Sequence, residues 1–345
     1  MLKILLSAGF AALMVTTATA SPGNDVNQQA RVQWHQAIAN GYQALAAAAE
    51  QFAAVSNGYC KAPDKRSRQS VEDAWLSAFL AWQRIRFVDF GPIENDNLAW
   101  QFQFWPDPKN LVGRKAAYLL KQEEPVTPQM VADSGVAVQG FPMAEYLLFD
   151  EQLNHSERAL PATSTCGLLS AVSVHIRANS QALAHDWQSF RGHYLDTDAY
   201  RDTTIRAAMA ALEILGERRL AQPMGLRGNG NRSAYAADAW RSGTSTRAIE
   251  ATVTGLQRYF LPGFETLLLH SSQPELADRI RGQFEEVQEN FPELRAAMSA
   301  LLSEDGRYGK LQGLYVDISQ LANLVNEQAA AELGVIRGFN SSDGD

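Results

Sequence analysis

The stretch that says most about this chain is Gly140-Phe141-Pro142-Met143-Ala144-Glu145-Tyr146-Leu147-Leu148-Phe149. Its glycine, glutamate and apolar tail predict a helix that ends near Asp150. Pro142 suits the first turn of this helix, where its missing N–H removes no hydrogen bond. Glu145 has two interpretations. It is either a functional carboxylate that faces a cleft, or an exposed or salt-bridged residue paired with an arginine of the preceding helix.

Three other segments accompany this stretch. A helix that contains Arg84 leads into Asp89-Phe90-Gly91-Pro92, and Phe104-Trp105-Pro106-Asp107 follows. Downstream, Trp240-Arg241-Ser242-Gly243-Thr244-Ser245 opens a helical run that we expect to end near Pro262-Gly263. Residues 89–110 break the helical periodicity with prolines and aromatic residues. This is the pattern of a long ordered loop, and such loops tend to be functional.

Together these segments resemble the imelysin-like family. The family signature is Gly-x-His-x-x-Glu followed by an aromatic residue and two leucines, and here Pro142 stands where the family has histidine. In the family, a histidine and a glutamate three residues apart share one helix face and could bind one metal ion. Proline offers no side-chain ligand, so Glu145 is the only ligand of the motif that remains.

A second family element, Glu-Ser-x-x-Ser, corresponds to the segment at Trp240. In one register Trp240 and Arg241 replace the glutamate and the first serine. A register shifted by one residue stays open.

The resemblance implies an all-α fold of two packed helical bundles, a duplicated four-helix-bundle architecture. It also implies a site in the cleft between the bundles. The residues expected there are Gly140, Pro142, Glu145, Arg84, Asp89, Trp105, Asp107, Trp240 and Arg241.

The hydrophobic periodicity of the chain is that of helices. Residues 26–55 carry Trp34, Ile38, Tyr42 and Leu45 at three-to-four spacing, and later helices are expected over 163–194, 198–220, 274–290 and 310–336. The polar segment 151–161 is the expected linker. We therefore divide the chain into a signal peptide (1–20), an N-terminal bundle (21–155), a C-terminal bundle (156–338) and a disordered tail (339–345).

The first twenty residues have the pattern of an export signal. Lys3 precedes an apolar core, and Ala18-Thr19-Ala20 forms a cleavage site. We expect an exported, periplasmic protein with no membrane span after cleavage. Loss of Lys3 takes the formal charge from −8 to −9. An acidic chain is a poor nucleic-acid binder, because neutralising phosphates requires clustered cations.

Cys60 and Cys166 are the only cysteines of the chain. In an exported protein they are expected to form a disulfide. The alternative is two small buried apolar side chains.

Arginines are concentrated between Arg218 and Arg247, where the single acid is Asp238. Such guanidinium groups can bind carboxylates or phosphates. The alternative is that they pair with acids of the other bundle, such as Asp89 and Asp107. Of the histidines, none is placed to share an ion with another, and no His-Glu-x-x-His motif is present.

These features favour a non-catalytic binding component which, by resemblance, is linked to bacterial iron uptake. Its expected ligand is iron or an anionic iron chelate, and no cofactor is assigned firmly. One alternative is a metallopeptidase of the imelysin type, and the missing histidine argues against it. The other is an adaptor that binds a periplasmic or outer-membrane protein partner and no small ligand.

Overall fold

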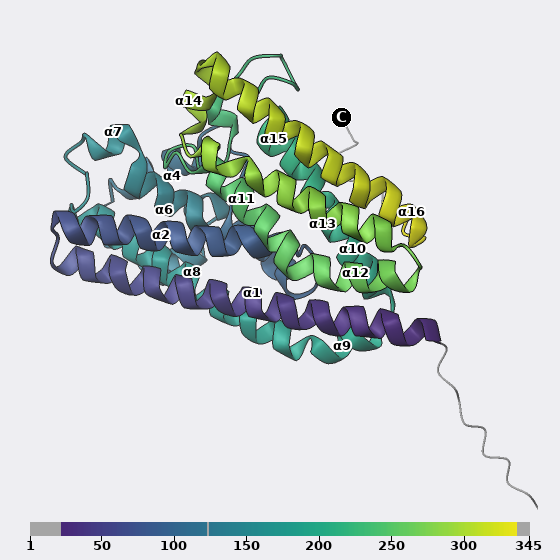
Figure 1. Cartoon of the computed structure of the whole chain (residues 1–345). Helices are drawn as coiled ribbons and strands as arrows, with labels where there is room; N and C mark the ends of the chain where they lie inside the picture. Colours follow the sequence, from purple (N-terminus) through teal and green to yellow (C-terminus); the bar gives the residue numbers. More distant parts are fainter. Residues whose placement is uncertain (1–21, 123, 337–345) are drawn as a thin grey trace, which may run out of the picture.

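The computed structural model describes residues 22–122 and 124–336, and within these ranges the chain forms helices and turns without a strand (Figure 1). The predicted all-α class is therefore confirmed. The predicted signal peptide and the tail 339–345 lie outside the described residues.

The longest helix, α1 (Pro22–Lys61), runs along the base of the molecule from end to end (Figure 1). Trp34, Ile38, Tyr42 and Leu45 are at most 1% exposed, as their spacing predicts. This face packs against α2 (Lys65–Ile85) and α8 (Thr163–Ser189). Helix α6 (Gly140–Phe149) lies against both α2 and α8.

The ends of α1 and α8 are joined by a disulfide. Cys60 in the last turn of α1 is bonded to Cys166 in the first turn of α8, with 5.6 Å between their Cα atoms. The predicted pairing is confirmed. Since the two cysteines are 106 residues apart, the bond closes a long loop around α2 and α6.

The second group of helices comprises α10 (Ala199–Glu213), α13 (Pro274–Glu289) and α15 (Asp305–Asn323). Both α10 and α13 pack on α15. Two further helices connect this group to the first, because α11 (Ser245–Gly255) packs on α2 and α12 (Leu261–His270) packs on α1. Helix α8 follows the expected linker in sequence, yet it packs on α1 and α6. The division near residue 155 stays a prediction.

The contact between α2 and α11 requires a glycine. A Cβ atom on Gly255 would lie 1.8 Å from the carbonyl oxygen of Arg84. No side chain fits in that space, so the two backbones touch at this point.

The expected end of a helix at Pro262-Gly263 is wrong. Helix α11 continues through a π-helical turn (Leu256–Phe260) directly into α12. Pro262 falls in the first turn of α12, where an N–H is not needed. The expected single helix over 163–194 also differs, because α8 ends at Ser189 and a separate short helix α9 (Arg191–Asp196) follows.

The remaining short elements connect these helices. They are η1 (Gly91–Asn97), α3 (Leu98–Phe102), α4 (Leu111–Leu119), α5 (Pro128–Ala132), η2 (Val136–Val138), α7 (Glu151–Asn154), η3 (Ile214–Ala221), η4 (Ala234–Ala236), η6 (Phe291–Leu294), α14 (Met298–Ser303), η7 (Leu324–Ala329) and α16 (Ala330–Glu332). Of these, η3 and η7 are π-helical.

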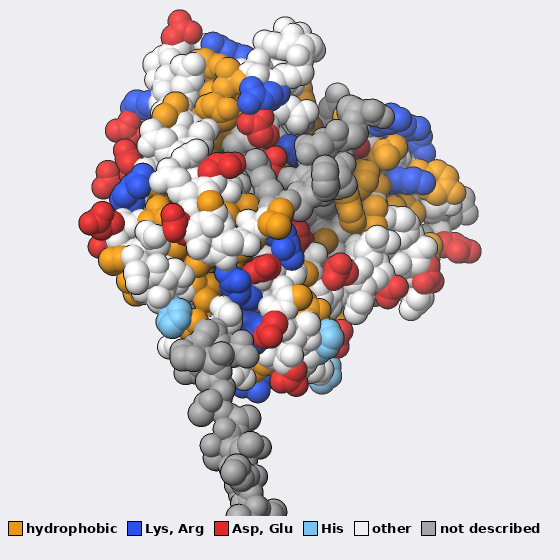
Figure 2. All heavy atoms as spheres, turned by 90° about the vertical axis from the view of Figure 1, so that its right-hand side faces the viewer, with side chains coloured by type: hydrophobic (Ala, Val, Ile, Leu, Met, Phe, Trp, Pro, Cys, Tyr) orange, Lys and Arg blue, Asp and Glu red, His pale blue; other side chains and the backbone are white. Residues whose placement is uncertain are grey.

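Acidic and basic side chains alternate on the face at the right of Figure 1, and Figure 2 shows no broad basic area there. Among the described residues, no helix combines the length and apolar character that crossing a bilayer requires.

Candidate functional site

The site is formed where α6 meets the turn that precedes α11. Glu145 lies on α6 and is only 5% exposed. Its Oε1 accepts hydrogen bonds from the backbone N–H of Ser242 at 2.8 Å and from the Ser242 hydroxyl at 2.9 Å. The motif carboxylate therefore joins two segments that are almost a hundred residues apart.

Burial raises the pKa of Glu145 to about 7. The two bonds from Ser242 and the charge of Arg241 act in the opposite direction, and Asp238 adds to the increase. Burial outweighs the hydrogen bonds because the ionised form loses most of its hydration. Glu145 therefore changes protonation state near neutral pH.

Arg241 lies beside Glu145, but its guanidinium is already occupied. Its Nε donates to Asp150 at 3.0 Å and its Nη2 donates to Asn110 at 2.8 Å. The same group lies 4.2 Å from the centre of the Trp240 ring and 5.1 Å from that of Tyr146. These contacts fix the turn to α6 and neutralise the charge of Arg241.

A buried polar network connects the two groups of helices. Asp238 is 2% exposed and contacts Arg219 at 2.8 Å, Arg86 at 3.6 Å and the amide nitrogen of Gln103 at 3.3 Å. Arg219 also donates to Thr252 at 2.8 Å.

The network contains two arginines and one aspartate. Burial and the neighbouring Arg219 lower the pKa of Arg86 to about 10, and Asp238 acts in the opposite direction. Arg86 remains charged at neutral pH, as arginines in proteins do. One positive charge is left over, and the Arg86 side chain is 19% exposed.

The start of α6 depends on Gly140. Its φ is +73°, and a Cβ atom there would lie 2.3 Å from the carbonyl oxygens of Gln101 and Phe102. Pro142 occupies the first turn of the helix, as predicted. The motif glycine thus allows α6 to begin against the segment 98–103.

Of the other residues expected at the site, Asp107 caps α4. It accepts from the N–H groups of Leu111 and Val112 at 2.7 and 2.9 Å. It is linked to the site through Asn110, which binds Arg241. Tyr235, 73% exposed, packs edge-on against Trp240 with 4.7 Å between ring centres.

The structure therefore brings Glu145, Trp240 and Arg241 together. Asp107 lies three residues before Asn110, which binds Arg241. Among the described residues, no hydrogen bond or ion pair connects Arg84, Asp89 or Trp105 with this group. Arg84 lies at the α2–α11 contact.

Of the arginines in the arginine-rich segment, Arg241 pairs with an acid of the expected N-terminal bundle, and two others pair with acids of their own half. Arg219 binds Asp238, Arg227 binds Glu217 and Arg241 binds Asp150. Asp89 and Asp107 bind none of the three. Two of these acids lie within 25 residues of their arginines, so much of this charge is neutralised locally.

The residues present do not fit the metal site that the family signature implies. Pro142 supplies no ligand, and Oε1 of Glu145 is engaged by Ser242. Within residues 22–122 and 124–336, no three His, Cys, Asp or Glu side chains are grouped so that they could hold a metal ion.

The fold and the α6 site define an all-helical protein whose signature carboxylate lies between two groups of helices. The imelysin family model matches residues 38–325, and the chain belongs to this family.

The solved structures similar to this chain include the following two. An imelysin-like protein from Psychrobacter arcticum 273-4 has a TM-score of 0.81 at 19% identity, covering 94% of this chain and 100% of that chain. A structure from Parabacteroides distasonis ATCC 8503, named for an iron-regulated protein A precursor, has a TM-score of 0.68 at 15% identity. It covers 90% of this chain and 97% of that chain. No curated protein sequence matches significantly.

Ser242, Asp150 and Gln103 were not singled out from the sequence. Ser242 binds Glu145, and Asp150 binds Arg241. Each contact joins segments that are far apart in the chain, so it leaves no local sequence pattern. Asp238 carried a signal, since it is the single acid of an arginine-rich segment.

Proposed function

We propose that this imelysin-family protein is an exported, non-catalytic binding component of bacterial iron uptake. The observation that carries the proposal is that Glu145 is engaged by hydrogen bonds within the protein. The motif carboxylate accepts two hydrogen bonds from Ser242, and the residue one turn before it is proline. Hydrolysis at a metal generally needs three protein ligands and a base, and this motif retains one carboxylate.

The link to iron rests on the family and on the name of the Parabacteroides neighbour. The predicted leader, Lys3 through Ala20, supports export to the periplasm.

The ligand that we expect is an anionic iron chelate bound beside Arg86. Arg241 is neutralised by Asp150, so the uncompensated charge belongs to the pair Arg86 and Arg219. Arg86 is the one of that pair with an exposed edge. A chelate carboxylate bound there would gain a charge-assisted hydrogen bond of ~1.5–3 kcal/mol.

The test is calorimetric titration of the purified protein with ferric citrate, with citrate alone and with ferric ion supplied from nitrilotriacetate. We expect ferric citrate to bind and Arg86→Gln to weaken that binding about tenfold or more, as loss of such a bond predicts. Arg86→Lys keeps the charge and should retain most of the affinity. Arg177→Gln, at a half-exposed pair with Glu50, is the matched control.

Two results would overturn the proposal. The first is binding of bare ferric ion that is lost in Glu145→Ala and unaffected by Arg86→Gln. The second is chelator-sensitive peptide cleavage by the wild type that Glu145→Ala abolishes, which would establish the metallopeptidase alternative.

A further inference from the structure

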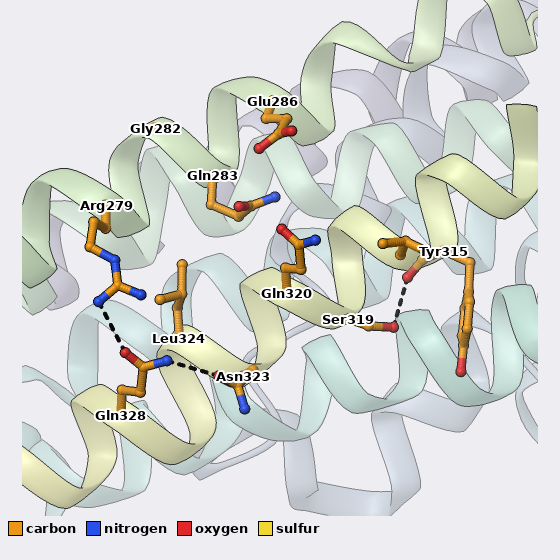
Figure 3. Close-up of a pocket in the computed structure, with 11 residues that line it drawn as sticks. Arg279, Gly282, Gln283, Glu286, Tyr315, Ser319, Gln320, Asn323, Leu324 and Gln328 are labelled. Atoms are coloured by element: carbon orange, nitrogen blue, oxygen red, sulfur yellow. Dashed lines mark hydrogen bonds between the residues drawn. The ribbon is translucent and has the colours of Figure 1, made fainter.

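A groove lies between α13 and α15 on the second group of helices (Figure 3). It has a volume of about 680 Å³, and the buried Leu324 contributes to its lining. None of its lining residues belongs to α6 or to the turn at Ser242. The groove is therefore a feature separate from the Glu145 site.

The middle of the groove is lined by amide side chains that face one another. Gln283 on α13 is only 9% exposed, and its nitrogen donates to the Asp317 carbonyl at 3.3 Å. Among the described residues, its amide oxygen has no hydrogen-bond partner. Figure 3 shows Gln283 and Gln320 directed towards each other from the two helices. The pair thus offers donors and acceptors to a ligand in the groove.

A π-helical turn places two more amides at one end. Asn323 and Gln328 lie five residues apart, and Gln328 Nε2 donates to Asn323 Oδ1 at 2.9 Å. In a π-helix such residues lie on nearly the same side, because its backbone hydrogen bonds join residues five apart rather than four. Arg279 donates to Gln328 Oε1 at 3.2 Å. The amide nitrogen of Asn323 donates no hydrogen bond within the described part of the chain.

The groove has opposite charges at its two ends. Arg279 and Glu286 both line it from α13 and are seven residues apart, a rise of ~10 Å. An extended polypeptide advances ~3.3 Å per residue, so about three residues span that distance. Each peptide unit has one N–H donor and one carbonyl acceptor, and an amide side chain has two N–H donors and one carbonyl acceptor, so the two groups can pair.

We propose that this groove binds a short extended segment of another polypeptide. Neutral polar residues of that segment would lie over Gln283 and Gln320, with an acidic residue near Arg279 and a basic residue near Glu286. A sugar is the less suitable ligand. The ring of Tyr315 extends away from the Gln283–Gln320 pair in Figure 3, and its hydroxyl interacts with Arg227.

The experiment uses the purified full-length protein and two pools of blocked pentapeptides, acetyl-Lys-x-x-x-Asp-amide and acetyl-Asp-x-x-x-Lys-amide. The central positions vary among Ala, Gly, Ser, Asn and Gln. The peptide most enriched by the wild type is labelled, and its affinity is measured by fluorescence anisotropy. We expect Gln320→Ala to weaken binding about tenfold, because two peptide hydrogen bonds are lost.

Gln312→Ala is the matched control, because Gln312 is an exposed glutamine of the same helix that does not line the groove. It should bind as the wild type does. Three results would overturn the proposal: no peptide is enriched, the enriched peptide binds Gln320→Ala and wild type equally, or maltopentaose binds in a Gln320-dependent way and displaces the peptide.

Discussion

Glu145→Gln should change how the stability of the protein depends on pH. Burial raises the pKa of Glu145 from 4.5 to about 7, so the folded state holds this proton more tightly than the unfolded state does. The resulting stability is fully present below the unfolded pKa of 4.5. It is lost as the pH rises through 7.

The magnitude follows from the two pKa values. Each unit of difference between the folded and unfolded pKa corresponds to 1.36 kcal/mol. Between pH 5 and pH 8, the shift of Glu145 therefore lowers the free energy of unfolding by about 2.5 kcal/mol. A glutamine keeps an oxygen that can accept from Ser242 and carries no charge at either pH. The variant should lack this part of the pH dependence.

The assay is urea denaturation of wild type and Glu145→Gln at pH 5 and pH 8. Other titrating groups are common to both proteins, so they cancel when the two pH differences are subtracted. The expected remainder is about 2.5 kcal/mol, with the variant relatively more stable at pH 8. Equal pH dependence in the two proteins would refute the buried, proton-binding description of Glu145. Glu285→Gln, at an exposed position of α13, should follow the wild type.

Three further substitutions test the packing of the fold by the same denaturation assay. Gly255→Ala should cost more than about 3 kcal/mol or prevent folding, because its Cβ would lie 1.8 Å from the Arg84 carbonyl oxygen; a loss below 1 kcal/mol would contradict the close contact. Asp238→Asn should cost about 3–5 kcal/mol, since it leaves the buried Arg219 without its counterion; a neutral result would mean that water reaches this network. Cys166→Ser should cost about 2–5 kcal/mol by opening the disulfide, and reduction of the wild type should reproduce the effect.

Helix positions were predictable where apolar residues repeat regularly. Trp34, Ile38 and Tyr42 recur at three-to-four spacing, and all are buried. The prediction failed at Pro262, because a proline ends a helix only if the helix needs its N–H. The preceding π-helical turn changes the bonding so that Pro262 falls in a first turn.

The site was less predictable than the fold. The sequence indicates that Glu145 is unusual, since it is a carboxylate within an apolar helix. It does not indicate that Ser242 binds it, because this contact depends on how α6 and α11 meet. For the same reason the sequence left open whether Arg241 binds a ligand or pairs with an acid of the other bundle, and Asp150 is that acid.

The contacts of the serines also favour one register of the second family element. Ser242 donates to Glu145, and the Ser245 hydroxyl donates to the Asp238 carbonyl at 2.6 Å. Both serines are thus engaged at the site, as expected if they are the two serines of Glu-Ser-x-x-Ser. Arg241 then stands where the family has its glutamate.

In that register the two residues that differ from the family motifs, Pro142 and Arg241, both lie near Glu145. Pro142 lies one turn before Glu145 on α6, and Arg241 is the residue before the serine that binds Glu145. One change removes a neutral ligand, and the other replaces an acid with a cation. Both make the surroundings of Glu145 less suited to a metal ion. The cation is in turn balanced by Asp150 at the end of α6. In this chain the carboxylate of Glu145 instead links α6 to the turn before α11 through the two hydrogen bonds from Ser242.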